Sequence, residues 1–263
     1  MAKLPRANKE LGQHFLRDKK VINAITTDWE DEADVIVEVG PGPAVLTEFL
    51  SKKNKPYYVI EMDHRFKEHL EVYVQEDHIF MQDALSFNWE DFITEKKLEN
   101  KKIWLVSNLP YNVGTVLFTN FLQVPQITFM SLMFQKEVGD KTYLRQEKNH
   151  TNGLLTLSLN YFESKQLCKV SPGCFSPPPK VDSVVVSYKR KNSPKISISD
   201  YKSLNSFTRL LFSLKRKQVQ SVLKSRYSKE QLEKAFLETN ISEKLRAEAL
   251  GLDQVYALYN ALN

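Results

Sequence analysis

Four apolar segments of the chain each end in residues that could bind a ligand. Val35–Val39 runs into the turn Gly40–Pro43, and Glu61, Asp83 and Asn108 follow later apolar segments. Glycines in such a turn allow a sharp bend and a close approach of the backbone to a ligand. An acidic residue about 20 positions further on can accept hydrogen bonds from ribose hydroxyls. The spacing therefore predicts a site for a nucleoside-containing cofactor. A nicotinamide dinucleotide is the weaker choice, since Val45 stands where a third glycine would be expected.

The elements that position these residues are read from the runs of β-branched and aromatic side chains. Strands are expected at Val35–Val39, Tyr57–Met62, Ile79–Met81, Ile103–Val106 and Ile127–Phe134. Stretches with helical spacing, such as Val45–Leu50 and Phe66–Val74, lie between them. Apolar strands without alternation that are separated by helices favour a parallel sheet covered on both faces. Ligands of such sheets bind at the carboxyl ends of the strands.

The second half of the chain changes character after about 190 residues. We expect a helix at Leu154–Tyr161, a closing pair of strands at Gln166–Val170 and Asp182–Tyr188, and a linker at Lys189–Ser199. Beyond it the pattern is helical, with one apolar face formed by Leu204, Phe207, Leu211, Leu214 and Val222. The predicted fold is an α/β domain at residues 1–191 followed by a small all-helical domain at residues 192–263.

Charge and composition narrow the class of protein. The net charge is +5, but residues 189–263 hold 15 Lys and Arg against 7 Asp and Glu, whereas residues 1–188 sum to −3. A basic tail on a mildly acidic body suggests an anionic partner or a solvated charged surface. Cys168 and Cys174 are expected to be free thiols. The polar segment Met1–Glu10 shows no secretory signal, and the apolar runs are too short to span a membrane, so a cytoplasmic protein is expected.

The segment Ser107–Tyr111 carries the residues best suited to chemistry on a flat base. The Asn108 side-chain oxygen and the Leu109 carbonyl can accept hydrogen bonds from an exocyclic amine, while Tyr111 can stack on the ring. The amine of adenine is a poor nucleophile because its lone pair is delocalised. Two fixed acceptors favour a pyramidal nitrogen whose lone pair points at an activated methyl group. Such a transfer needs mainly orientation and electrostatics.

Seven motifs, read in order, resemble the ribosomal RNA adenine dimethyltransferases of the KsgA type. The Asn-Leu-Pro-Tyr and Phe-x-Pro-Pro-Pro-Lys-Val-Asp-Ser elements are the most specific of them. The motifs are Leu11-Gly-Gln-His-Phe-Leu16, Glu38-Val-Gly-Pro-Gly42, Ile60-Glu-Met-Asp63, Gln82-Asp-Ala84, Asn108-Leu-Pro-Tyr111, Gln135-Lys-Glu-Val138 and Phe175-Ser-Pro-Pro-Pro-Lys-Val-Asp-Ser183.

The resemblance implies a Rossmann-like class I methyltransferase sheet with a small helical C-terminal domain. It implies S-adenosylmethionine as methyl donor, no metal, and dimethylation of two adjacent adenines near the 3′ end of small-subunit ribosomal RNA during ribosome assembly. The cofactor would be lined by His14, Leu16, Gly40, Glu61, Asp83 and Asn108. The target base would be held by Asn108, Leu109, Tyr111 and Phe175. Base–aromatic stacking is worth roughly 1–3 kcal/mol per base.

Three positions depart from the usual family pattern. His14 replaces an asparagine, Pro43 follows the glycine turn, and Asn152-Gly-Leu154 replaces Tyr-Gly-Arg. The last change removes a cation and bears on how the segment 140–153 holds RNA. Pro43 is expected in the first turn of a helix, where proline is tolerated.

The basic tail is expected to contact RNA phosphates from a helix after the linker. Its candidate residues are Lys215, Arg216, Lys217, Lys224 and Arg226. The partners would be small-subunit ribosomal RNA and the immature small subunit, with the protein acting as a monomer. Two alternatives stay open: an Erm-type methyltransferase of large-subunit RNA, and an assembly factor with little catalysis.

Overall fold

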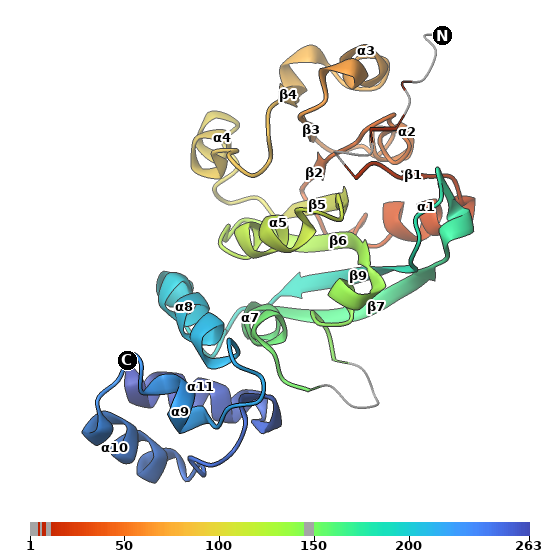
Figure 1. Ribbon diagram of the computed structural model, residues 1–263. Coiled ribbons are helices and arrows are strands. Elements are labelled where there is room, and N and C mark those ends of the chain that lie inside the picture. The colour runs from red at the N-terminus through yellow and green to blue at the C-terminus, as the bar shows by residue number, and fades with distance from the viewer. Residues whose placement is uncertain (1–4, 6, 9–11, 145–149) are drawn as a thin grey trace. The chain divides into compact units, whose positions relative to one another are not determined.

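The computed structural model describes residues 5, 7, 8, 12–144 and 150–263 of the chain (Figure 1). Leu11 and residues 145–149, to which the sequence assigned motif and RNA-contact roles, lie outside the described residues. The chain divides into two compact units. Unit 1 comprises Met1–Asp140 and Ser164–Arg190, and unit 2 comprises Lys141–Glu163 and Lys191–Asn263.

This division differs from the sequence-based one in the segment 141–163, which joins the C-terminal helices. Thr151 Oγ1 donates a hydrogen bond to the Leu250 carbonyl, and the Tyr256 hydroxyl donates to the Thr156 carbonyl at 2.8 Å. The segment therefore has partners about 100 residues away in the sequence, which no local pattern reveals.

A seven-stranded mixed sheet dominates the α/β part of the chain. Five strands run parallel, and β9 runs antiparallel to β6. In spatial order the strands are β4 (Ile79–Met81), β3 (Tyr57–Glu61), β2 (Val35–Val39), β5 (Ile103–Asn108), β6 (Ile127–Gln135), β9 (Ser183–Arg190) and β7 (Phe162–Val170). The predicted α/β class and all five predicted parallel strands are confirmed.

Side chains from both faces of the sheet are buried under helices. Ile36, Val59 and Trp104 belong to a core cluster that also contains apolar residues of α1 (Lys19–Thr26), α2 (Thr47–Leu50) and α3 (Lys67–Leu70). Neighbouring strand residues point to opposite faces. Tyr58 accordingly meets α4 (Trp89–Glu95) on the other face, where its ring lies edge-on to Phe92 at 5.2 Å. Helix α5 (Gly114–Phe121) covers β6 through Phe118 and Phe134, whose centroids are 5.6 Å apart.

The strand order reverses between β2 and β5. From β2 the chain proceeds outward through β3 and β4, whereas β5 leads to β6 on the opposite side. The crevice at the carboxyl ends of the strands beside such a switch point is where open α/β sheets bind ligands. Gly40 directly follows β2, while Glu61 and Asn108 are the last residues of β3 and β5.

A second, two-stranded sheet was not expected from the sequence. Strand β1 (Phe15–Leu16) pairs antiparallel with β8 (Phe175–Ser176), so that Leu16 lies opposite Phe175. The Arg17 amide extends the pairing by donating to the Cys174 carbonyl at 2.8 Å. Two-residue strands leave no periodic pattern, because their pairing depends on residues about 160 positions away.

The predicted linker Lys189–Ser199 starts two residues too early, because β9 continues through Arg190. The Arg190 guanidinium donates to the carbonyls of Leu122, Val124 and Ile127 at 2.7–3.2 Å. This charged residue therefore anchors the end of the strand to the loop before β6.

Unit 2 is helical, apart from the first residues of β7. Its helices are α7 (Gly153–Tyr161), α8 (Tyr201–Leu211), α9 (Val219–Leu223), α10 (Lys229–Thr239) and α11 (Leu252–Leu262). Leu204, Phe207 and Leu211 are fully buried, as the spacing predicted. Leu214 is 52% exposed, because α8 ends at Leu211.

The prediction that the basic residues lie in a helix is wrong. Lys215–Lys217 occupy a turn between α8 and α9, and Lys224 and Arg226 lie in the turn after α9. Gln218 forms an isolated antiparallel bridge with Arg246, and the Val219 amide donates to the Leu245 carbonyl. These distant backbone partners interrupt the helix that the local sequence favours.

Candidate active site

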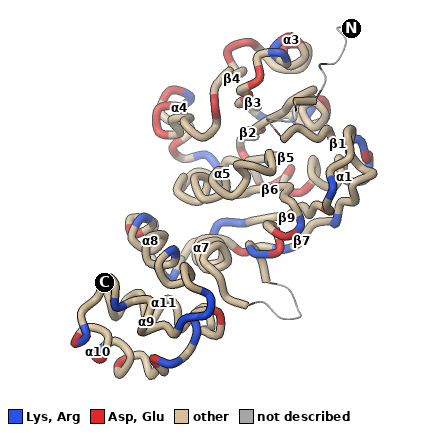
Figure 2. Tube along the Cα trace, in the orientation of Figure 1, with Lys and Arg blue, Asp and Glu red and all other residues tan. Residues whose placement is uncertain are grey.

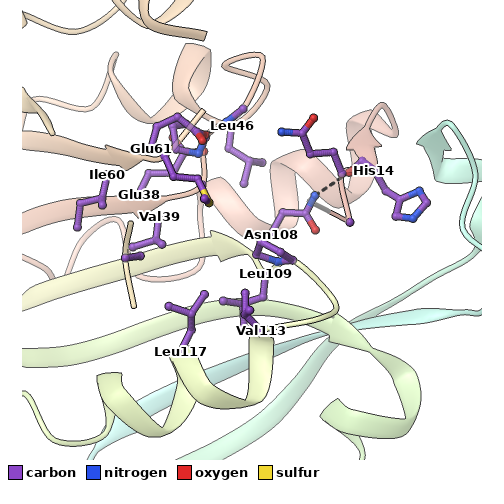
Figure 3. Close-up of a pocket in the computed structure, with 18 of the residues that line it drawn as sticks. His14, Glu38, Val39, Leu46, Ile60, Glu61, Asn108, Leu109, Val113 and Leu117 are labelled. Atoms are coloured by element: carbon purple, nitrogen blue, oxygen red, sulfur yellow. Dashed lines mark hydrogen bonds between the residues drawn. The ribbon is translucent and has the colours of Figure 1, made fainter. Parts of the chain in front are cut away.

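One cavity of unit 1 brings together three segments that are far apart in the sequence (Figure 3). They are Gly12–Leu16, the turn Gly40–Pro43 and the loop Asn108–Tyr111. Glu38, Glu61 and Asp83 complete the polar part of the wall. The cofactor candidates His14, Leu16, Gly40, Glu61, Asp83 and Asn108 thus all line the same space, as do Leu109 and Tyr111.

The glycine turn adopts a backbone that other residues rarely take. Gly40 has φ +68° and Gly42 has φ +53°, in the left-handed region that favours glycine. The Gly40 amide donates to the Ile60 carbonyl at 2.9 Å, which ties the turn to the neighbouring strand. A side chain at Gly40 would meet no heavy atom within 4 Å, so the turn leaves open space for a ligand. Pro43 lies in this turn and not in a helix as predicted, since α2 begins only at Thr47.

Glu61 is a buried carboxylate held by backbone donors. Its Oε2 accepts from the Gly42 amide at 2.9 Å and its Oε1 from the Asp63 amide at 2.8 Å. Burial raises the pKa of Glu61, and the backbone hydrogen bonds oppose that rise. A carboxylate has about four acceptor positions, so the same group can also accept hydroxyls from the cavity. Asp83 is exposed, and its Oδ1 accepts from the Leu85 amide at 2.9 Å.

Glu38 is a wall residue to which the sequence assigned no role. It is only 2% exposed, and its Oε2 accepts hydrogen bonds from Thr47 Oγ1 at 2.8 Å and from the Tyr57 hydroxyl. Burial raises the pKa of Glu38 to about 7. An acidic residue inside an otherwise apolar strand was the available signal, because a buried carboxyl needs partners.

The segment Gly12–Leu16, here called the strap, runs along the cavity. Gln13 Nε2 donates to Asp63 Oδ2 at 2.9 Å, and Arg65 Nε donates to Asp63 Oδ1 at 2.8 Å. The Arg65 guanidinium holds the pKa of Asp63 down at about 2. These contacts fasten the strap to the end of β3, whereas β1 fastens it to β8. The contacts of Gln13 with Asp63 and of Asp63 with Arg65 were not expected from the sequence.

Asn108 is oriented by the strap. Its Nδ2 donates to the His14 carbonyl at 3.0 Å (Figure 3). Oδ1 is then the side-chain atom that can accept a hydrogen bond, and no described residue supplies a donor for it. The Leu109 amide donates to the Met133 carbonyl at 3.2 Å, which fixes the start of the loop. Ser107 Oγ donates to the Val39 carbonyl at 2.7 Å and so links β5 to β2 next to the glycine turn.

The aromatic residues of the site form a group around His14. Its ring centroid lies 5.4 Å from that of Tyr111 and 6.5 Å from that of Phe175. His14 Nδ1 donates to the Pro177 carbonyl at 2.9 Å, and Figure 3 shows the imidazole projecting away from the other labelled side chains. Tyr111 lines the cavity and shares a hydrogen bond of 2.6 Å with Ser183. Phe175 is only 4% exposed and belongs to the core cluster, not to the cavity wall.

The remaining candidate residues belong to unit 2. Lys215, Arg216, Lys217, Lys224 and Arg226 are all exposed. Arg226 donates to Ser206 Oγ at 3.0 Å. Asn152, one of the departures from the family pattern, caps α7 by accepting from the Leu155 amide.

The described residues contain no group of three or more His, Cys, Asp or Glu that could hold a metal ion. None of the helices in that part of the chain has the length and apolar character needed to cross a membrane. Both cysteines are free thiols.

Comparison with known proteins decides the family. The model for "Ribosomal RNA adenine dimethylase" matches residues 5–263. The chain belongs to this family. It is a methyltransferase, and the resemblance to the KsgA type is confirmed.

Curated relatives agree with this assignment over nearly the whole chain. A ribosomal RNA small subunit methyltransferase A of Clostridium botulinum (strain Okra, type B1) is 34% identical over 254 residues, covering 94% of this chain and 90% of that protein. Its counterpart in Clostridium acetobutylicum is 32% identical over 255 residues, with coverages of 95% and 91%.

Solved structures share the fold. A dimethyladenosine transferase from Plasmodium falciparum has a TM-score of 0.76 at 20% identity, covering 93% of this chain and 96% of that one. The 23S rRNA methyltransferase ErmE has a TM-score of 0.70 at 23% identity, with coverages of 94% and 99%. The predicted class I methyltransferase sheet is therefore confirmed.

Proposed function

We propose that this chain uses S-adenosylmethionine to dimethylate N6 of two adjacent adenosines near the 3′ end of small-subunit (16S) ribosomal RNA during ribosome biogenesis. The names of its relatives support the choice of the small subunit. The observation that carries the proposal is the orientation of Asn108 by the His14 carbonyl at the wall of the cavity. The proposed setting is the cytoplasm, with a monomeric enzyme acting on the immature small subunit.

The cavity fits S-adenosylmethionine on several counts. Gly40 leaves space where a side chain would stand, and Glu61 offers acceptor positions for ribose hydroxyls. Asp83 lies on the same wall, and negative charge suits a cationic ligand. The strap adds the backbone of His14 and the side chain of Leu16. When bound, the cofactor supplies a methyl group on a positively charged sulfur.

The chain's own residues then orient the target amine. Asn108 Oδ1 and the Leu109 carbonyl would each accept one hydrogen from the exocyclic nitrogen of adenine. With both hydrogens engaged, the lone pair of that nitrogen points out of the base plane. Positioning of this kind can supply several kcal/mol of the barrier. No strong general base is needed, because the methylated amine readily releases its proton.

Tyr111 is proposed as the stacking face for the base, since its ring lines the cavity and its hydroxyl is anchored by Ser183. Phe175 is proposed as the second face. The His14 ring lies beside both of these rings, 5.4 Å from that of Tyr111 and 6.5 Å from that of Phe175. The exposed Lys215, Arg216, Lys217, Lys224 and Arg226 are proposed to contact RNA phosphates from unit 2.

The variant Asn108→Ala tests the proposal. We expect loss of methyl transfer from labelled S-adenosylmethionine to immature small subunits, with binding of the particles retained. Asn54→Ala is the matched control. Asn54 is exposed in the turn before β3, at the end of the strand away from the cavity. Primer extension on the small-subunit RNA locates the modified adenosines.

Unchanged methylation by the Asn108→Ala variant would remove the mechanism. Methylation of naked large-subunit RNA in place of small subunits would favour an Erm-type enzyme. Tight particle binding by the wild-type chain without methyl transfer would favour an assembly factor.

A further inference from the structure

The charge of the α/β body is strongly polarised. Residues 61–100 hold 11 Asp and Glu against 4 Lys and Arg, a net charge of −7. Acidic residues recur around α3, on either side of β4 and in α4 (Figure 2). Since residues 1–188 sum to −3, the remainder of that stretch is net positive. The small net charge of residues 1–188 is therefore the sum of an acidic part and a basic part, and the basic part could face an anionic ligand.

Part of that basic remainder forms a groove in unit 1, distinct from the cavity described above. The groove lies between the start of α1, the end of β7 and the start of β9. Three lysines line it, together with two aspartates, two serines and the two cysteines. The residues are Asp18, Lys20, Val21, Lys136, Cys168, Lys169, Val170, Ser171, Cys174, Asp182 and Ser183.

Two of the lysines are available to a ligand. Lys20 and Lys169 are exposed, and neither forms an ion pair with any residue in the described part of the chain. Lys136, in contrast, is paired with Asp140 at 2.8 Å. Asp18 is engaged as the cap of α1, where its Oδ1 accepts from the amides of Lys20 and Val21 at 2.9 and 3.0 Å. Asp182, the other aspartate, is exposed and forms no ion pair with any described residue, so the lining as a whole carries three positive charges against two negative ones. Lys20 and Lys169 are the two groups in it that are free to contact an anion.

A hydrogen bond links a residue of the groove to a residue of the cavity. Ser183 lines the groove, and its hydroxyl meets that of Tyr111 at 2.6 Å. Tyr111 lines the cavity on the other side of this contact. A strand whose base enters the cavity beside Tyr111 would thus have its flanking backbone next to Ser183, in the groove that Lys20 and Lys169 also line.

We propose that this groove binds the phosphodiester backbone of the RNA next to the target nucleotide, with Lys20 and Lys169 as phosphate contacts. The inference rests on the proposed function, because it assumes that an RNA base enters the cavity. Lysine contacts to phosphate position the strand and make its affinity depend on salt, without reading its sequence. The groove would add to any contribution from the basic turn Lys215–Lys217.

The test uses the full chain with the paired substitution Lys20→Ala and Lys169→Ala. Binding of a fluorescein-labelled RNA hairpin from the 3′ end of small-subunit RNA is followed by anisotropy over a range of salt concentrations. Two lost phosphate contacts should lower the slope of log K against log salt by about 1.4–1.8 and weaken binding roughly tenfold or more at low salt. The variant Lys20→Arg with Lys169→Arg should bind like the wild type.

The matched control replaces Lys101 and Lys102 by alanine. Both are exposed and precede β5, at the amino-terminal end of that strand, whereas the cavity lies at its carboxyl end. This control should leave RNA binding unchanged. Affinity for S-adenosylmethionine, measured by calorimetry, should stay the same in all three variants, which shows that the fold is intact.

Methyl transfer separates this inference from the proposed function. The alanine pair should raise KM for RNA while the rate at saturating RNA stays near that of the wild type. Wild-type affinity and salt slope in the alanine pair would overturn the groove proposal and leave the methyl-transfer mechanism standing. The proposal would also be overturned if the Lys101→Ala and Lys102→Ala control lost as much RNA binding as the alanine pair in the groove. The loss would then reflect overall charge and not a local contact.

Discussion

A single added methyl group at Gly40 tests both the conformation of the turn and its proximity to the cofactor. Gly40 has φ +68°, and a Cβ there would meet no heavy atom within 4 Å. Gly173 is equally uncrowded but does not have a positive φ. The pair Gly40→Ala and Gly173→Ala therefore separates the backbone effect from packing, because neither new methyl group causes a clash.

The magnitudes follow from the two backbone conformations. Both substitutions restrict the unfolded chain, which stabilises the folded state by about 0.4–1 kcal/mol. At Gly40 a left-handed backbone adds a cost of about 1–2 kcal/mol for a residue with a Cβ. The free energy of unfolding should therefore be about 1–2 kcal/mol lower for Gly40→Ala than for Gly173→Ala. Chemical denaturation of both variants measures this difference.

Cofactor binding supplies the second readout. The methyl group of Gly40→Ala would stand in the open space of the cavity. We therefore expect the Kd for S-adenosylmethionine to rise at least tenfold, which is a loss of about 1.4 kcal/mol of binding free energy. Gly173 does not line the cavity, and its variant should bind normally. Wild-type affinity in Gly40→Ala would refute the argument that this turn approaches the cofactor.

Two further predictions concern the ionisable residues Glu38 and Arg190. Burial raises the pKa of Glu38 to about 7 from 4.5, so the folded state holds this proton more tightly than the unfolded state and the free energy of unfolding falls as pH rises between these values. Denaturation from about pH 5 to about pH 8 should show a smaller fall in Glu38→Gln than in the wild type, and an unchanged fall would contradict the assignment. Arg190→Ala should destabilise the fold by at least about 2 kcal/mol, since three carbonyls lose their charged donor. Lys189→Ala breaks a half-exposed pair with Glu32 and cation–π contacts with the rings of Trp29 and Phe129. It should cost less than Arg190→Ala, and equal losses would argue against the anchoring role of Arg190.

The positions of the five parallel strands along the chain, and the ligand-facing residues at their carboxyl ends, could be predicted from the sequence. Val35–Val39 and Ile103–Val106 are continuous apolar runs, which is the pattern of strands buried on both faces. Residues that end such strands in a parallel sheet must meet at one edge. For this reason Gly40, Glu61 and Asn108 could be assigned to one site before their positions were known, and all three line the same cavity.

The tertiary structure alone decided how these residues are held and oriented. Asn108 takes its orientation from the carbonyl of residue 14, which in turn is held through Gln13 and the pairing of β1 with β8. The basic turn after α8, expected as helix, is shaped by a bridge between Gln218 and Arg246.

The physical reason is the range over which each interaction acts. Hydrophobic period and turn chemistry depend on neighbours within a few residues, so they can be read from the sequence. A hydrogen bond between Asn108 and His14, or a groove shared by Lys20 and Lys169, joins residues that are neighbours only because the whole chain has folded.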